Sequence, residues 1–184
     1  AILLGRNAAL IVMASILACR VCGCPRDGVI KAVRAFRGIA HRIEFAGEKN
    51  GVAFYDDSKG TNVGAVARAL ETFSQPVILL LGGRDKGGNF DTLAAFTRKG
   101  VKEIILFGEA RENIRRMIGG IVKTSLAPTL REAVEKAYAD ASTGDVVLLS
   151  PGCASFDEFK DYRERGNFFK GIVRKIIAGE IPKG

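Results

Sequence analysis

The sequence predicts an α/β fold in which a mainly parallel, Rossmann-like sheet carries helices on both faces. Continuous apolar runs such as Val77–Leu81 and Val146–Ser150 are typical of strands that are buried on both faces. Segments with helical periodicity follow these runs along the chain. Alternation of strands and helices is typical of parallel sheets with helical crossovers.

The N-terminal region predicts helices only. Residues 7–20 are mostly apolar and predict a buried helix. Pro25 breaks the chain, and Asp27 is placed to cap a second helix that ends near Phe36. Strand patterns begin after residues 37–40. We therefore expect a helical tail over residues 1–37 and the α/β domain over residues 38–184.

The first half of the α/β domain alternates between strands and helices. Two alternating runs joined at Asn50-Gly51 predict a β-hairpin. A helix is expected after Thr61, because its apolar residues recur at helical spacing. They are Val63, Val66, Leu70 and Phe73. Val77–Leu81 predicts a buried strand, and a further helix is expected after Asp91.

The second half continues the alternation. The expected elements are a strand at Glu103–Phe107, a helix at Arg111–Ile118, a short strand near Val122, a helix opened by Thr129, the strand Val146–Ser150 and a last helix that includes Phe168–Ile177.

The net charge of +8 favours an anionic partner such as a nucleotide, a phosphate or an acidic metabolite. The basic residues are scattered and the aromatic residues are not interleaved with them, so we expect no nucleic-acid partner. The apolar run Ala8–Ala18 is too short to cross a bilayer, so we expect no membrane partner.

Three of the four cysteines crowd one stretch, Cys19, Cys22 and Cys24, and the fourth is Cys153. A zinc site is one alternative, but no second Cys pair completes it and the single histidine is His41. We expect no metal site in this chain and reduced thiols in a cytoplasmic protein.

Ligands of parallel sheets bind outside the carboxyl ends of the strands, so the residues after each strand are the candidates for a site. In DDSKGTN, Thr61 or Asn62 would begin a helix whose N–H groups attract an anion. Lys59 adds a positive charge, and Asp57 could accept a hydrogen bond from a ribose hydroxyl. The alternative is an ordinary capped turn in which Asp57 and Lys59 are solvated.

Two other strand ends carry similar groups. Gly82-Gly83 would let a ligand approach the backbone and would present Lys86, although an exposed glycine-rich loop is the alternative. No Walker loop or dinucleotide fingerprint is present. In SPGCAS, Ser155 would belong to a serine-rich helix cap that binds a carboxylate, with Asp157 early in that helix.

Taken together, Lys59, Thr61, Lys86 and Ser155 predict a cationic, hydroxyl-lined pocket for a small dianion. The Cys153 thiol is a less favoured nucleophile, because no partner for it is visible in the sequence.

Several motifs in the same order resemble the C-terminal part of the Mur ligase family, the ATP-dependent amide ligases of bacterial peptidoglycan synthesis. They are Gly38, His41, Arg42 and Glu44; Asp57–Asn62; Leu79–Lys86; Ser150–Phe159; and Arg165-Gly166. The sequence DSKGTN favours the branch that adds D-glutamate to UDP-N-acetylmuramoyl-L-alanine through an acyl-phosphate intermediate.

The resemblance implies a role for each candidate residue. Thr61, Lys86 and Ser155 would hold the D-glutamate carboxylates, with the backbone near Tyr162 assisting. Lys59 would be the catalytic residue that stabilises charge on the phosphate. Arg42 and Asp57 would contact ATP, Arg42 near phosphate and Asp57 near ribose. A solvated hairpin residue is the alternative for Arg42, and His41 is expected to be a packing or turn histidine.

The resemblance also implies parts that this sequence does not contain. Residues 1–37 would be the tail of a central ATPase domain, and the Mg²⁺ ligands and the nucleotide-sugar domain would lie elsewhere. Asn7, Ala8 and Ile11 stand where the family has His-Asn-x-x-Asn. We expect the chain alone to be inactive. The alternative function is a stand-alone, non-catalytic module that binds a nucleotide or an acidic metabolite.

Overall fold

The computed structural model describes residues 6–93, 95, 100–118, 120 and 122–183. The chain divides into two compact units, Ala1–Ala40 and His41–Gly184. The predicted boundary lies a few residues before this division. A search of the described helices finds none that is long and apolar enough to cross a membrane.

The first unit consists of helices α1 (Arg6–Val21) and α2 (Arg26–Ala35), so both predicted helices are confirmed. The predicted burial of the first helix is wrong. Five of its large apolar side chains, Leu10, Ile11, Met13, Leu17 and Val21, are 54–81% exposed, and Val12 and Ile16 are half-buried. A unit of two helices is too small to enclose the apolar surface of α1.

The expected helix cap at Asp27 is also wrong. The N-cap residue of α2 is Pro25, which makes no side-chain capping bond, and Asp27 is already the second residue of the helix. Its carboxylate therefore lies in the first helical turn, where it complements the helix dipole instead of capping a free N–H group.

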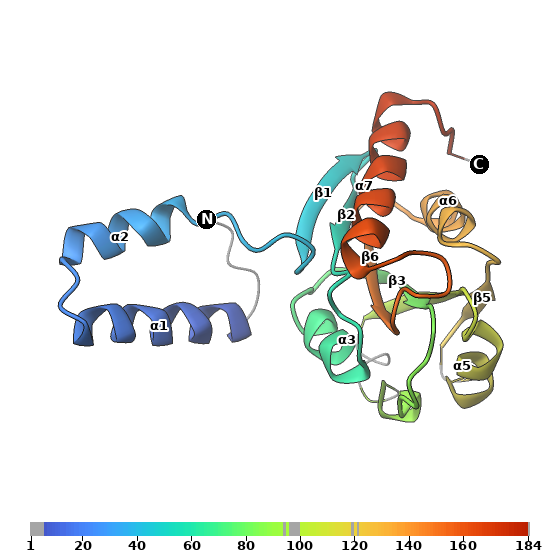
Figure 1. The fold of residues 1–184 in the computed structure, drawn as a ribbon. Helices are drawn as coiled ribbons and strands as arrows, with labels where there is room; N and C mark the ends of the chain where they lie inside the picture. Colours follow the sequence, from blue (N-terminus) through green and yellow to red (C-terminus); the bar gives the residue numbers. More distant parts are fainter. Residues whose placement is uncertain (1–5, 94, 96–99, 119, 121, 184) are drawn as a thin grey trace. The chain divides into compact units, whose positions relative to one another are not determined.

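The second unit is built on a six-stranded sheet with the order β1-β2-β6-β3-β4-β5 (Figure 1). The strands are β1 (Glu44–Lys49), β2 (Val52–Asp56), β3 (Val77–Gly82), β4 (Val101–Phe107), β5 (Thr124–Leu126) and β6 (Val146–Gly152). Only the β1–β2 pair is antiparallel. Its turn is the predicted hairpin, in which Asn50 and Gly51 have φ values of 54° and 74°.

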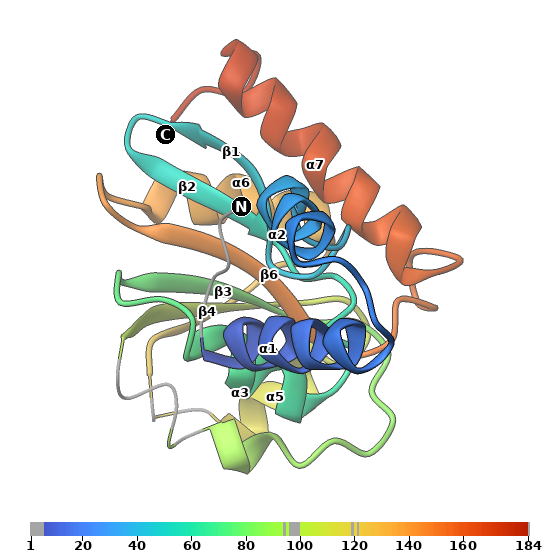
Figure 2. The ribbon, with the colours of Figure 1, turned by 90° about the vertical axis from the view of Figure 1, so that its left-hand side faces the viewer.

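Helices cover both faces of this sheet, as predicted. They are α3 (Val63–Leu70), α5 (Arg111–Ile118), α6 (Leu130–Asp140) and α7 (Tyr162–Ala178), with a 3₁₀ helix η1 at Phe90–Leu93. Figure 2 shows α7 on one side of the sheet and α3 and α5 on the other.

Alternate residues of each central strand face opposite cores. In β3, Ile78 and Leu80 pack with α6 and α7, whereas Leu79 and Leu81 pack with α3, η1 and α5. The continuous apolar run of β3 is therefore explained by burial on both faces.

Three predicted elements differ in detail. Of the helix expected after Asp91, the described residues are those of η1 and the helical Ala95, and residues 94 and 96–99 lie outside the described residues. The short strand expected near Val122 lies at Thr124–Leu126. The prediction that places Asp157 in the last helix is wrong, because α7 begins at Tyr162 after its N-cap Asp161.

Candidate functional site

Three loops follow neighbouring parallel strands and lie together at one edge of the sheet. We call them the rim loops: residues 56–62 after β2, 82–88 after β3 and 150–155 at the end of β6. The Gly152 N–H donates to the Gly60 carbonyl at 2.8 Å. Arg84 and Ala154 exchange backbone hydrogen bonds of 2.9 and 3.0 Å. Main-chain bonds therefore join each rim loop to another.

A fully buried arginine strengthens this connection. Arg165, from the first turn of α7, donates from Nε to the Ser58 hydroxyl at 2.9 Å and from Nη2 to the Ser58 carbonyl at 3.0 Å. Nη2 also donates to the Cys153 carbonyl at 3.1 Å. Burial lowers the pKa of Arg165 to about 10. Sequence reasoning gave this residue no role, and the only signal was its place in the Arg-Gly motif.

A second buried pair, His41 and Asp56, links the start of the second unit to the end of β2. His41, which has a φ of 62°, lies with Nδ1 2.7 Å from Asp56 Oδ2. The other oxygen of Asp56 accepts the Ser58 N–H at 2.9 Å. Gly166 packs against this pair so closely that a Cβ there would lie 2.2 Å from His41 Nδ1. His41 is thus a buried turn histidine that contacts the loop after β2.

Asp57 is buried, so the interpretation of this carboxylate as a solvated turn residue is wrong. Its Oδ2 accepts the Ser150 hydroxyl at 2.7 Å. Burial raises the pKa of Asp57 to about 6, against the lowering effects of Ser150, the Ile43 backbone and Arg42. The acid ties the loop after β2 to the end of β6.

The Lys59 ammonium lies over the Tyr162 ring at the rim loops. Lys59 Nζ is 4.1 Å from the centroid of the Tyr162 ring, an arrangement in which the ring attracts the ammonium. The Tyr162 carbonyl accepts the Ser58 hydroxyl at 2.8 Å. As the first residue of α7, Tyr162 has an N–H that finds no acceptor within the helix. This amide can therefore bind an anion.

Thr61 is half-buried and stands directly before Asn62, the N-cap of α3. The Asn62 side chain accepts the Ala65 N–H at 2.9 Å. Of the two residues considered for the helix start, Asn62 makes the cap. Thr61 is left in the turn beside the Gly60–Gly152 contact.

Lys86 and Ser155 lie on the other two rim loops. Lys86 is exposed, with Nζ 5.9 Å from the centroid of the Phe156 ring, next in sequence to the buried Ser155. The Ser155 carbonyl accepts the Glu158 and Phe159 N–H groups, so this residue belongs to a turn several residues before α7. Its predicted place in a helix cap is wrong.

Gly82 and Gly83 are required by the protein's own backbone packing. Their φ values are 145° and 124°, and added Cβ atoms would lie 2.0 Å from the Phe107 carbonyl oxygen and 2.3 Å from that of Ala154. The close approach predicted from this pair is therefore made by neighbouring strands and loops.

Two other candidate sites, the Cys153 thiol and a cluster of possible metal ligands, are disfavoured by their surroundings. Burial raises the pKa of the Cys153 thiol to about 12, so a nucleophilic thiolate at neutral pH is disfavoured. His41, Glu44 and Asp56 offer ligand atoms within 4.8 Å of one another. However, Lys170 Nζ lies 2.9 Å from Glu44 and 3.9 Å from Asp56, so an ammonium already pairs with these carboxylates and disfavours a metal ion there.

The exposed side chain of Arg42 follows His41 and is close enough to Asp57 to lower the pKa of that carboxyl group.

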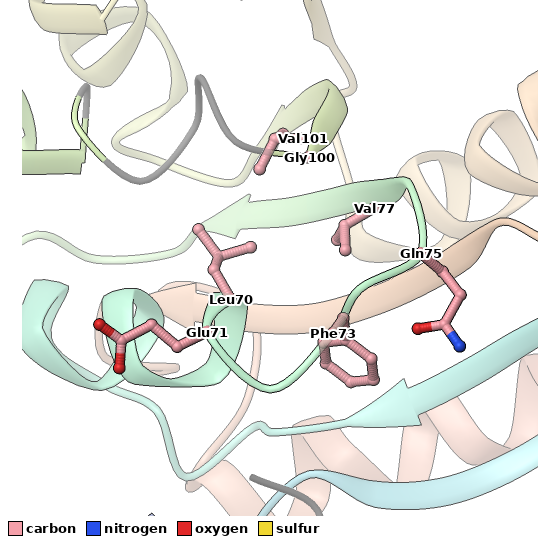
Figure 3. A pocket seen from close by; sticks show the side chains of 7 residues that line it. All are labelled: Leu70, Glu71, Phe73, Gln75, Val77, Gly100 and Val101. Carbon is pink, nitrogen blue, oxygen red and sulfur yellow. The ribbon is translucent and has the colours of Figure 1, made fainter. Parts of the chain in front are cut away.

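A small pocket lies elsewhere, near the starts of β3 and β4 (Figure 3). It is lined by Leu70, Glu71, Phe73, Gln75, Val77, Gly100 and Val101. These residues do not belong to the rim loops, and none of them carries a positive charge that would favour an anion.

Comparisons with known proteins agree with this architecture. Residues 41–153 match the family model described as Mur ligase, glutamate ligase domain. UDP-N-acetylmuramoylalanine--D-glutamate ligase from Syntrophus aciditrophicus is 64% identical over 163 residues, which cover 89% of this chain and 36% of the relative. The ligase of the same name from Bdellovibrio bacteriovorus is 49% identical over 172 residues, 94% of this chain and 37% of the relative.

The chain therefore spans a little over a third of these relatives. Among solved structures, MurF from Acinetobacter baumannii has a TM-score of 0.68 at 14% identity, covering 95% of this chain and 38% of that one. MurF ligase from Thermotoga maritima in complex with ADP has a TM-score of 0.61 at 19% identity, covering 92% and 39%. These structures share the fold, and the family model matches more than half of the sequence. The chain thus belongs to the Mur ligase family, with residues 41–153 in its glutamate ligase domain.

Proposed function

We propose that this chain is the C-terminal part of an ATP-dependent ligase that joins D-glutamate to UDP-N-acetylmuramoyl-L-alanine. The observation that carries the proposal is the 64% identity to a relative named for this activity, over most of the chain. Residues 1–37 would be the tail of the central ATPase domain and residues 38–184 the D-glutamate-binding domain. The compact unit that begins at His41 supports this division.

In this proposal the rim loops hold D-glutamate. The Lys86 ammonium neutralises one of its carboxylates, and the hydroxyls of Thr61 and Ser155 orient the pair. The free N–H of Tyr162, at the positive end of α7, adds a donor for the same anion. Fixing both carboxylates leaves the amine as the group that faces the acyl carbon.

Lys59 is the proposed catalytic residue. ATP supplies the phosphoryl group that activates the alanyl carboxylate of the second substrate. The Lys59 ammonium, held at the rim by the Tyr162 ring, stabilises the negative charge on that phosphate as the amine attacks and phosphate leaves. The exposed guanidinium of Arg42 would contact the ATP phosphates.

Asp57 is proposed to contact ATP near the ribose. Its buried bond to Ser150 means that such a contact would use the second carboxylate oxygen or an exchange of partners. No Mg²⁺ site is proposed in this chain. The proposed ligands of that ion, like the nucleotide-sugar contacts, belong to domains outside the sequence.

A chimera tests the proposal. The matching segment of the Syntrophus aciditrophicus relative is replaced by this chain, and phosphate release is measured with D-glutamate, L-glutamate or no amino acid. We expect release that depends on D-glutamate. Lys86→Ala should raise the KM for D-glutamate roughly 10- to 100-fold, as expected when a charged hydrogen bond is lost.

Lys59→Ala should instead lower kcat by roughly 100-fold or more, because it removes charge stabilisation at the phosphate. Lys175→Ala is the matched control, since this exposed lysine lies in the last turn of α7. A folded chimera that releases phosphate equally with and without D-glutamate would contradict the proposal and would favour a module that only binds nucleotide.

A further inference from the structure

The last turn of α1 and the turn that follows it contain three of the four cysteines, and the proposed ligase reaction uses none of them. Cys19 and Cys24 are partly buried, and Cys22 is exposed. Helix α1 ends here in a Schellman motif. The Cys24 N–H donates to the Cys19 carbonyl at 2.9 Å, the Gly23 N–H donates to the Arg20 carbonyl at 3.1 Å, and Gly23 has a φ of 76°.

This motif determines which two thiols meet. In a Schellman motif the side chain three positions before the C-cap residue frequently contacts the side chain two positions after it. Those positions are Cys19 and Cys24, whereas Cys22 is the C-cap residue between them. Partial burial raises the pKa of Cys19, the neighbouring Cys24 thiol raises it further by charge and hydrogen bonding, and Cys22 contributes less.

We propose that Cys19 and Cys24 form a reversible disulfide and that this pair is a site of thiol oxidation in the protein. The backbone bond between the two residues holds the chain segments close together, as a disulfide requires. A preformed trithiolate metal site is less well supported. Among the residues that the structure describes, the three sulfurs are not gathered within 4.8 Å of one another.

The oxidant is a small disulfide such as oxidised glutathione. One cysteine thiolate attacks it, which forms a mixed disulfide and releases one glutathione thiolate. The second cysteine attacks the protein sulfur of the mixed disulfide, forms the Cys19–Cys24 bond and releases the second glutathione. Two electrons pass from the protein to the small disulfide, and the two thiol protons end on the released thiols.

The test equilibrates the 184-residue chain with oxidised and reduced glutathione, blocks the remaining thiols by alkylation and maps the peptides by mass. We expect one intramolecular disulfide between Cys19 and Cys24. Cys22 and the buried Cys153 should be alkylated after denaturation. A synthetic peptide of residues 17–26 gives the reference, and the folded chain should oxidise at least about tenfold more readily because its thiols are preorganised.

Variants distinguish an effect of the Schellman motif from an effect of simply having three thiols nearby. Cys22→Ser should retain the disulfide, whereas Cys19→Ser and Cys24→Ser should lose it. Gly23→Ala should lower the equilibrium constant for oxidation roughly fivefold, because alanine disfavours the left-handed conformation that closes the motif. The proposal is overturned if Cys22 takes part in the dominant disulfide, or if the folded chain oxidises no more readily than the peptide. Ligase activity is not part of this test, so its outcome is independent of the proposed function.

Discussion

Strand β3 and helix α1 are both rich in apolar side chains, but they meet different surroundings. All six residues of β3 are buried between two helical layers. In α1 most of the large apolar side chains are exposed and none of those described is buried, and its neighbour α2 has no buried residue. An apolar pattern therefore predicts the type of element, whereas burial depends on how many other elements are present to cover it. We therefore expect the two units to differ in stability and in tolerance to substitution.

The largest contrast is expected from two leucine truncations. Leu80→Ala removes a fully buried side chain of β3 and should lower the free energy of unfolding by about 4 kcal/mol, through lost burial and a new cavity. Leu17→Ala removes a side chain that is 66% exposed and should change it by less than about 0.5 kcal/mol. Urea unfolding followed by circular dichroism measures both. A cost above about 1 kcal/mol for Leu17→Ala would break the comparison.

A pair of glycines in α7 sharpens the comparison within a single helix. Gly166→Ala would place a Cβ 2.2 Å from His41 Nδ1 and 2.6 Å from Asp56 Oδ2, and should cost about 3 kcal/mol. Gly171→Ala meets nothing closer than Arg174 Nη2 at 3.9 Å and should gain about 0.5 kcal/mol from helix propensity. Equal effects of the two substitutions on unfolding by urea would show that the His41–Asp56 pair is not tightly packed.

The buried Asp57 should make the second unit depend on pH. Its folded pKa of about 6 lies above the usual value, so the folded state binds more protons between pH 4 and pH 6. Stability should therefore fall as pH rises through this window, by up to about 3 kcal/mol.

Asp57→Asn should remove this part of the pH profile, which unfolding at a series of pH values measures. Asp161 is a partly exposed control with the opposite sign, because hydrogen bonds from the Glu164 and Arg163 backbones lower its pKa. A wild-type profile that matches that of Asp57→Asn would contradict the assigned burial.

A small stabilising effect is expected in the first unit. Gly28→Ala adds a Cβ with nothing within 4 Å to a glycine inside α2, and should stabilise that helix by about 0.5–1 kcal/mol. Amide exchange in α2 should slow a few-fold, while the urea midpoint of the second unit should not move. A shift in that midpoint would show that the two units do not unfold independently.

The parts of the fold that the sequence predicted depend on local rules. Asn50-Gly51 supplies two residues that tolerate positive φ, so the hairpin follows from the turn alone. The apolar runs of β3 and β6 predicted a parallel sheet, and parallel strands necessarily bring their following loops to one edge. Thr129 was predicted to open a helix, and it is the N-cap of α6, where its hydroxyl accepts the Glu132 N–H only three residues away.

The parts that it did not predict depend on distant residues. Arg165 is buried because Ser58, which is far away in the sequence, and Cys153 on the loop after β6 supply its hydrogen-bond acceptors. Asp57 is buried for the same reason, since its partner is Ser150. The start of α7 was placed too early because Ser155 and Asp157 resemble a helix cap locally, whereas Asp161 makes the capping bond. A sequence pattern does not distinguish a charged residue that links two loops by hydrogen bonds from a charged residue that is solvated.

The central claim is that the three rim loops together hold an amino dicarboxylate. Titrating the isotope-labelled chain with D-glutamate, to roughly 10 mM to reach weak binding, tests this claim directly by amide chemical shifts. The account predicts shifts at Lys59, Thr61, Lys86, Ser155 and Tyr162, smaller shifts with L-glutamate, and loss of the response in Lys86→Ala but not in Lys175→Ala. Shifts confined to other regions, such as the pocket near Leu70 and Val101, would contradict it.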